Sequence, residues 1–385
     1  MKYNHFNDTI IYHILAKFVS LGVMLMKKLD WRAKQWNDAK SKKAERKLHR
    51  KNLIKRYLGL MEYKSNRKVR NQPPLSINDE KDNHNPCKFE APPVFSIKNN
   101  PEQTITFFND ILYKRKEHIC GMQFFIDSSK VEKVTVDALM FLIAIITDTK
   151  SNIRYKFGFE GNFPICANAR KVYDECGFTS FVRSSSRASI KPESQSIQIL
   201  QGKYVTTQVA TKVCEFVQSV GGYTMQDTIP LYESLIELMG NTNSHAYKSK
   251  DKLEGFWYIF VEEREDEIEF VFLDTGLGIP TTVRRKWSEK IVPIKPDSEF
   301  ITSALNGENR TQTLMLNRGK GLPQISDNFK AGLLKDVFIQ SGKGCCVLSH
   351  DVKEGYRAID YRLKLHGTLF CWKILKLKGG IECEN

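Results

Sequence analysis

The chain has 385 residues, of which 41% are apolar and 27% charged, as in a globular protein that is too long for one ordinary hydrophobic core. The net charge of +15 is concentrated at one end, because residues 1–75 carry 19 Lys/Arg against 5 Asp/Glu. This distribution excludes a fold that is basic throughout. The nine cysteines show neither Cys-x-x-Cys pairs nor zinc-site spacing, so we expect a reducing, cytoplasmic compartment.

Residues 9–26 form an apolar run near the lower length limit of a membrane span, but the run contains His13 and Lys17. No small-residue cleavage site follows it, which argues against a signal peptide. Three interpretations stay open: a membrane anchor, a packed or interfacial amphipathic helix, and a reading frame that really begins at Met24 or Met26. We favour the amphipathic helix and do not expect a membrane protein.

The stretch 27–70 is strongly basic and nearly free of glycine and proline, so we expect residues 1–75 to be a mostly helical basic segment. Trp31, Trp36 and Tyr57 are interspersed among its charges. Basic residues with interleaved aromatics are typical of DNA- or RNA-binding segments, because cations displace counterions from phosphates and rings stack on bases. The alternative is a solvated basic helix that binds nucleic acid only non-specifically.

Prolines and polar residues over 76–94 predict a linker, and a compact unit is expected over 95–183. Within it, strand-like Met122–Asp127 precedes an apolar helix over Val134–Ile146. A second strand-like run then leads to a helix over Ala167–Cys176 that ends at a glycine. Strands that alternate with helices indicate an α/β layer.

This unit resembles a STAS domain, the fold of anti-sigma-factor antagonists. The resemblance rests on Phe124-Phe-Ile-Asp-Ser-Ser, on Asn162-Phe-Pro and on Gly177-Phe178. Phosphorylated STAS proteins carry Asp-Ser at the turn into the apolar helix, where this chain has Thr135-Val136. Valine has no hydroxyl, so the phosphorylation switch is not carried over, and Thr135 is at best a weak substitute.

A polar stretch over 184–200 predicts a second linker, and a last domain is expected over 201–378. Its pattern predicts a helix over Val205–Val220, a second helix from about Asp227, and a sheet. The predicted strands are Gly255–Glu262, Glu267–Leu273, Val337–Gln340, Cys345–Ser349 and Gly367–Leu375. Adjacent Cys345 and Cys346 should point to opposite faces of their strand and serve packing.

The second helix carries a polar stripe, because Glu237, Asn241 and His245 recur every four residues. Leu235, Leu238 and Met239 lie between them and can face a core. A carboxylate, an amide and an imidazole on one face form a polar site. The alternative for this stripe alone is a solvated helix face.

Three glycine-containing motifs follow in order. They are Asp274-Thr-Gly276-Leu-Gly278-Ile-Pro280, Gly319-Lys320-Gly321-Leu322 and Gly367-Thr368. Between the first two, Ile301–Arg318 is rich in polar residues, which is the composition of a weakly packed segment.

Together these four motifs resemble the GHKL ATPases, the Bergerat-fold (HATPase_c) group, over residues 200–378. The His-Ala-Tyr that ends the helix motif is most similar to the anti-sigma-factor serine kinases. The resemblance implies a two-layer α/β ATP-binding domain that uses Mg²⁺, with a mobile lid over Ile301–Arg318. The implied nucleotide contacts are Asn241, His245, Asp274, Gly276, Gly278, Arg318, Gly319, Lys320, Gly321, Leu322 and Thr368.

The resemblance implies that Asp274 accepts the adenine amino proton and that Asn241 coordinates Mg²⁺, a hard cation that prefers oxygen. Glu237 is the expected catalytic residue, placed to orient or deprotonate a nucleophile that attacks the γ-phosphate. With water as nucleophile the protein is an ATPase, and with a serine or threonine hydroxyl it is a kinase. His245 contacts a phosphate or caps the helix.

Two functions from different classes remain open. The first is a regulatory ATPase or protein kinase joined to a STAS-like domain, with a protein partner or a second copy of the chain as its partner. The second is a nucleotide-gated regulatory or defence protein that binds nucleic acid through residues 27–70, in which ATP changes conformation without significant turnover.

Overall fold

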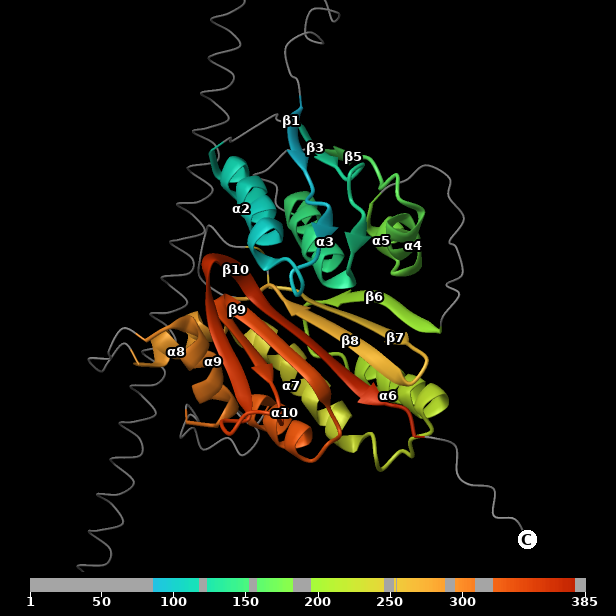
Figure 1. The fold of residues 1–385 in the computed structure, drawn as a ribbon, viewed down its shortest axis with the longest axis vertical. Coiled ribbons are helices and arrows are strands. Elements are labelled where there is room, and N and C mark those ends of the chain that lie inside the picture. Colours follow the sequence, from blue (N-terminus) through green and yellow to red (C-terminus); the bar gives the residue numbers. More distant parts are fainter. Residues whose placement is uncertain are drawn as a thin grey trace, which may run out of the picture. The chain divides into compact units, whose positions relative to one another are not determined.

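The computed structural model describes the chain over 86–117, 123–151, 158–182, 195–245, 253, 255–287, 295–308 and 321–377. In these ranges the fold is mixed α/β, as expected, with parallel and antiparallel sheets. His84–Asn385 form one compact unit. Figure 1 shows the arrangement of its elements.

The first sheet is parallel, with strand order β1-β3-β5. Its strands are β1 (Cys87–Glu90), β3 (Gln123–Asp127) and β5 (Gly158–Gly161). Alternate residues of β3, Phe124 and Ile126, are buried, as the period of a strand requires. A separate two-stranded parallel sheet joins β2 (Val94–Phe95) to β4 (Lys133–Val134).

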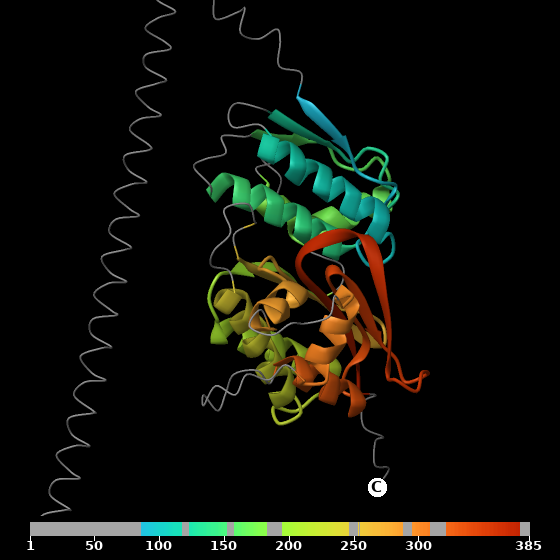
Figure 2. The same ribbon diagram turned by 90° about the vertical axis from the view of Figure 1, so that its left-hand side faces the viewer.

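Helices α2 (Pro101–Glu117) and α3 (Val136–Ser151) lie between this sheet and a larger one (Figure 2). Every residue of α3 from Ala138 to Ile146 is buried. A helix that is apolar on all sides must be shielded from water on all sides, and the larger sheet buries the side of α3 that the first sheet does not. The shorter helices α4 (Ala167–Glu175) and α5 (Phe178–Phe181) follow β5. The helix predicted over Ala167–Cys176 is confirmed, and it ends at Gly177 in the left-handed conformation, with φ 85°.

The larger sheet is antiparallel, with strand order β6-β7-β8-β10-β9. Its strands are β6 (Ser196–Gly202), β7 (Trp257–Glu263), β8 (Glu267–Asp274), β9 (Lys335–Leu348) and β10 (Tyr356–Leu375). Buried Cys345 packs in the cluster that contains α2 and α3, and buried Cys346 packs in the cluster on the opposite face. The prediction that these two thiols point to opposite faces is confirmed.

Helices pack against the other face of the larger sheet (Figure 1). They include α6 (Thr207–Gly221), α7 (Ile229–His245) and α10 (Gly321–Lys330). Two further helices, α8 (Ile279–Trp287) and α9 (Asp297–Leu305), lie beside β9. The helix predicted over Val205–Val220 is present as α6, and Gly222 follows it in the left-handed conformation, with φ 73°.

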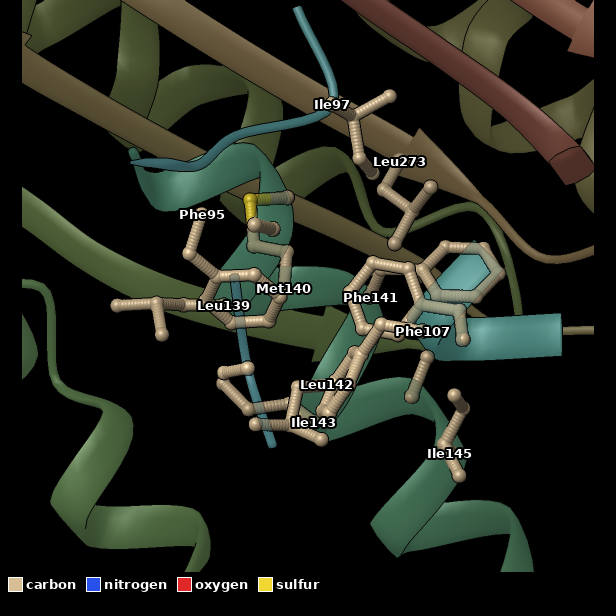
Figure 3. Close-up of a cluster of buried hydrophobic side chains, with 14 of the residues drawn as sticks. Phe95, Ile97, Phe107, Leu139, Met140, Phe141, Leu142, Ile143, Ile145 and Leu273 are labelled. Carbon is tan, nitrogen blue, oxygen red and sulfur yellow. The ribbon is translucent and has the colours of Figure 1, made fainter. Parts of the chain in front are cut away.

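One hydrophobic cluster joins the two predicted domains. Phe141 of α3 lies in the same buried cluster as Leu273 of β8, and Figure 3 shows both residues together with Ile97 and Phe107. The side-chain amide of Asn109 in α2 also donates a hydrogen bond of 3.3 Å to the carbonyl of Lys364 in β10. The residues predicted to form separate domains therefore share a core.

Three predicted boundaries are wrong in part. The linker predicted over 76–94 contains β1, and the linker predicted over 184–200 contains the first residues of β6. The predicted lid over Ile301–Arg318 begins inside α9, where Ile301 and Leu305 are buried. In each case pairing or packing with a distant segment outweighs a local composition rich in polar residues or proline.

Some predictions fall outside the described residues. These are the apolar run 9–26, the basic stretch 27–70 and the part of the predicted lid over 309–318. In the part of the chain that the structure describes, none of the helices combines the length and the hydropathy that crossing a membrane requires.

Candidate functional site

Helix α7 separates a buried face from a polar one. Leu235, Leu238 and Met239 are at most 3% exposed and pack against the larger sheet, as predicted. Glu237 and Asn241 are partly exposed, one helical turn apart. His245 is the last residue of α7, and its side chain lies outside the described part of the chain.

Asp274 ends β8 between two neighbouring strands. It is directly opposite Thr368 of β10 on one side and opposite Trp257 of β7 on the other. Thr368 is buried, and its backbone follows Gly367, which has φ 93°. A side chain at Gly367 would overlap the carbonyl oxygen of Asp274, so only glycine fits beside this strand end. The first and last glycine motifs therefore meet in the sheet.

The Asp274 carboxylate contacts both its own loop and α7. The backbone N–H of Gly276 donates to Oδ1 at 2.8 Å. Thr242 of α7, the residue after Asn241, helps to lower the pKa of the same carboxyl, and its hydroxyl donates to the carbonyl of Leu238 at 3.3 Å. A Cβ on Gly276 would lie 3.0 Å from Oδ1, which is tighter than ordinary contact. The helix motif and the first glycine motif thus meet at one carboxylate.

Burial determines the electrostatics of this carboxylate. It raises the pKa of Asp274 from its ordinary 3.8 to about 6, while the hydrogen bond from the Gly276 N–H and the nearby Thr242 hydroxyl oppose the rise. The group is therefore ionised at neutral pH, and it is more easily protonated than an exposed aspartate. An ionised buried carboxylate is a strong acceptor for a donor on a ligand.

The loop after Asp274 is held by backbone and hydroxyl contacts. The buried hydroxyl of Ser341 in β9 donates to the carbonyl of Gly367 at 2.8 Å and accepts from the N–H of Ile279 at 2.9 Å. It also lies 2.9 Å from Thr368 Oγ1. Gly278 has φ 79°, and a Cβ there would lie 2.7 Å from Ser341 Oγ. Ser341 therefore ties this loop to β9 and β10.

The second glycine motif is described only in part. Arg318, Gly319 and Lys320 lie outside the described residues. Gly321 begins α10, and partly buried Leu322 packs against the hydrophobic cluster between the larger sheet and its helices. The helix predicted to open at this motif is present. Farther along α10, the amide of Gln324 donates to Glu233 of α7 at 2.6 Å, so α10 is held against the helix that carries Glu237.

The position corresponding to the STAS phosphorylation site is engaged in a local contact. The hydroxyl of partly buried Thr135 donates to the carboxylate of Asp137, which also accepts from the N–H of Lys98 at 2.8 Å. Burial raises the pKa of Asp137. Thr135 lines a cavity of about 270 Å³ between α3 and the larger sheet. Its hydroxyl is thus bonded to Asp137 at the start of α3.

The site offers few groups that could hold a metal. Among the described residues, no group of three or more His, Cys, Asp or Glu side chains could hold a metal ion. A divalent cation would need the single amide oxygen of Asn241 together with ligand phosphates and waters, which is a set that suits Mg²⁺.

Two residues of this site, Thr242 and Ser341, were not predicted. The only sequence signal for Thr242 is its place after Asn241, and an isolated serine in a strand gives no signal at all. The fold has to bring β8, β9 and β10 together before either hydroxyl acquires a role.

No protein-family model matches the chain, and a search of curated proteins finds none with significant similarity to it.

Proposed function

We propose that residues 201–378 form an ATP-binding domain of the GHKL type, with the Bergerat fold, and that it acts with Mg²⁺. One observation carries the proposal: Asp274 and Thr368 are paired in register, and Thr242 of α7 helps to lower the pKa of the Asp274 carboxyl. Three of the four sequence motifs therefore meet at one end of the larger sheet. Motifs that are unrelated in function would have no reason to converge in this way.

The chemistry of this sheet end suits an adenine base. The ionised Asp274 carboxylate accepts the exocyclic amino proton, and the small Gly276 leaves room for a flat ring to approach the backbone. Thr368, next to Asp274, supplies a hydroxyl that already contacts Ser341 at 2.9 Å. The residues present therefore fit a nucleotide at its base end.

At the phosphate end we assign the metal contact to Asn241 and catalysis to Glu237. Bound Mg²⁺ would neutralise phosphate charge and offset the charge that develops during transfer. Glu237, one turn before Asn241, orients the nucleophile or takes its proton. Whether that nucleophile is water or a protein hydroxyl decides between an ATPase and a serine/threonine kinase.

We further propose that the preceding residues, 95–183, are a STAS-like regulatory part. The contacts of α2 and α3 with β8 and β10 support a regulatory connection, because Leu273 of the shared cluster immediately precedes Asp274 in β8.

Calorimetric titration of the full chain with ATP and Mg²⁺ tests the nucleotide site. We expect heat of binding that is lost in Asp274→Asn, because the amide presents an N–H where the ligand needs an acceptor. Absence of heat with the unaltered chain would refute the proposal.

Phosphate release then measures hydrolysis. Mass spectrometry of the chain itself, and of an added protein, detects phosphorylation, so the two assays separate an ATPase from a protein kinase. Glu237→Ala should abolish turnover and leave ATP binding nearly unchanged. Glu233→Ala, one turn earlier on the same helix, is the matched control, because Glu233 is exposed and contacts Gln324 instead. Turnover that survives in Glu237→Ala would remove the catalytic role, and nucleotide binding without any turnover would favour the gated-binding alternative.

A further inference from the structure

A cavity of about 270 Å³ lies between the larger sheet and the ends of α3 and α4. It is separate from the candidate nucleotide site, because Asn241, Asp274 and Thr368 are not among the described residues that line it. Its volume equals that of roughly nine water molecules, which is enough for a small ligand. Exposed Lys98 and Asn99 belong to its lining, so a ligand can enter from solvent.

The sheet side of this cavity changes from apolar to charged between two adjacent rungs of paired residues. The apolar rung has one residue from each of β7, β8 and β10, namely Phe260, Val271 and Cys371. The charged rung lies two residues away along each strand, on the same face, and consists of Glu262, Glu269 and Lys373. The two rungs together suit a ligand that has an apolar body and a charged end.

At the charged rung the carboxylates outnumber the cations that pair with them. Arg264 is shared between Glu262 at 2.7 Å and Glu269 at 3.3 Å. Lys373 is divided among three carboxylates, those of Glu267 at 2.6 Å, Asp336 at 3.3 Å and Glu269 at 3.6 Å. A further ammonium group would therefore be stabilised at this rung.

Lys98 brings the opposite charge to the same cavity. Its ammonium group lies 6.0 Å from the centre of the Phe338 ring, and Phe338 is paired with Cys371. Within the part of the chain that the structure describes, Lys98 forms no ion pair. Burial raises the pKa of the Cys371 thiol, while the charge of Lys98 lowers it and that of Glu269 raises it. Charges of both signs therefore lie near one thiol.

The buried carboxylate of Asp137 also lines the cavity, but it is already bonded. It accepts from the hydroxyl of Thr135, from the N–H of Lys98 at 2.8 Å and from the N–H of Ala138 at 2.9 Å. These donors leave it little capacity for a ligand. We therefore assign the contact with a ligand's ammonium group to the charged rung.

We propose that this cavity binds a small zwitterion, an α-amino acid with an apolar side chain. Its carboxylate meets Lys98, and its ammonium group meets Glu269. Its side chain packs on the apolar rung and on the partly buried Val136 and Val172, which close the cavity from α3 and α4. A ligand with one charge satisfies only one of the two charged groups, and glycine leaves the apolar rung in contact with water.

Calorimetric titrations of the full chain test the proposal with three ligands that share one apolar body. Leucine carries both charges, 4-methylpentanoic acid lacks the ammonium group, and 3-methylbutylamine lacks the carboxylate. We expect both single-charge ligands to bind at least about tenfold more weakly than leucine, because each loses one charged contact. Glycine should be weaker by at least as much, because it buries no methyl groups.

Equal affinity for leucine and for either single-charge ligand would overturn the proposal, as would an absence of leucine binding. The titrations contain no nucleotide, so this result is independent of the proposed ATP site. Either proposal can therefore fail while the other stands.

Three variants locate the ligand. Lys98→Gln removes the ammonium group and keeps the N–H that bonds Asp137, so it should weaken leucine binding at least about tenfold and leave 3-methylbutylamine unchanged. Lys133→Gln is the matched control, because Lys133 is exposed on β4 and is not among the described residues that line the cavity. Val172→Phe fills part of the cavity and should also weaken leucine binding. Unchanged leucine binding in Lys98→Gln or in Val172→Phe would place the ligand elsewhere and overturn the proposal.

Discussion

Gln340 of β9 is a buried amide whose replacement should stabilise the protein. Its side chain is 0% exposed, and neither Nε2 nor Oε1 has a hydrogen-bond partner among the residues that the structure describes. It lies opposite Leu369 of β10, which belongs to the cluster shared with α3. Burying a polar group without a partner costs about 1–3 kcal/mol, because its hydrogen bonds to water are lost on folding.

Methionine has nearly the shape of glutamine and no strong polar group, so Gln340→Met removes this cost without opening a cavity. We expect the free energy of unfolding to rise by about 1–3 kcal/mol and the melting temperature by roughly 2–8 °C. Urea denaturation measures the first quantity and calorimetry the second. An unchanged urea m-value would show that the denatured state is unaffected.

Gln198 of β6 provides a matched control of opposite sign. Its amide is half-buried and donates to the carbonyl of Glu175 at 3.2 Å, so Gln198→Met should lower stability by about 1 kcal/mol. A loss of stability in Gln340→Met would refute the reasoning, since it would mean that the amide has a partner, such as an ordered water, that the substitution removes.

Two further predictions concern the strand end. The pKa of Asp274 is about 6 in the folded state and 3.8 ordinarily, so the free energy of unfolding falls by about 3 kcal/mol as the pH rises from 4 to 6 and does not fall further above pH 6. Asp274→Asn should lack this fall when unfolding is compared at pH 4 and pH 8, and an equal pH dependence in both proteins would contradict the burial of the carboxyl. Gly367→Ala should lower the free energy of unfolding in urea by about 3 kcal/mol or more, because the methyl group would overlap the Asp274 carbonyl. Gly355→Ala should lower it by only about 1 kcal/mol, because Gly355 has φ 74° and a Cβ there would meet none of the described residues within 4 Å; similar losses would contradict the steric argument.

Features that depend on local chemistry could be predicted from the sequence. Glycine adopts the left-handed conformation without a steric penalty, so Gly177 and Gly222 mark the ends of α4 and α6. The spacing of Leu235, Leu238 and Met239 likewise identifies the buried face of α7, because a helix returns to the same face every three to four residues.

Features that depend on distant partners could not be predicted in this way. Cys87–Glu90 is flanked by prolines and becomes a strand only by pairing with β3, and Ser196–Gly202 becomes one by pairing with β7. The same holds at the candidate site. Ser341 is an ordinary residue in the sequence, and its hydroxyl gains its partners only when the strands are in register.

The position of α2 and α3 between two sheets affects how the protein can be divided for experiments. Removing residues 86–182 would leave Leu273, Phe338 and Leu369 facing water, although all three are now at most 4% exposed. Such a shortened chain would expose an apolar surface and tend to aggregate. A failure of the shortened chain to bind or hydrolyse ATP would therefore say nothing about the nucleotide site.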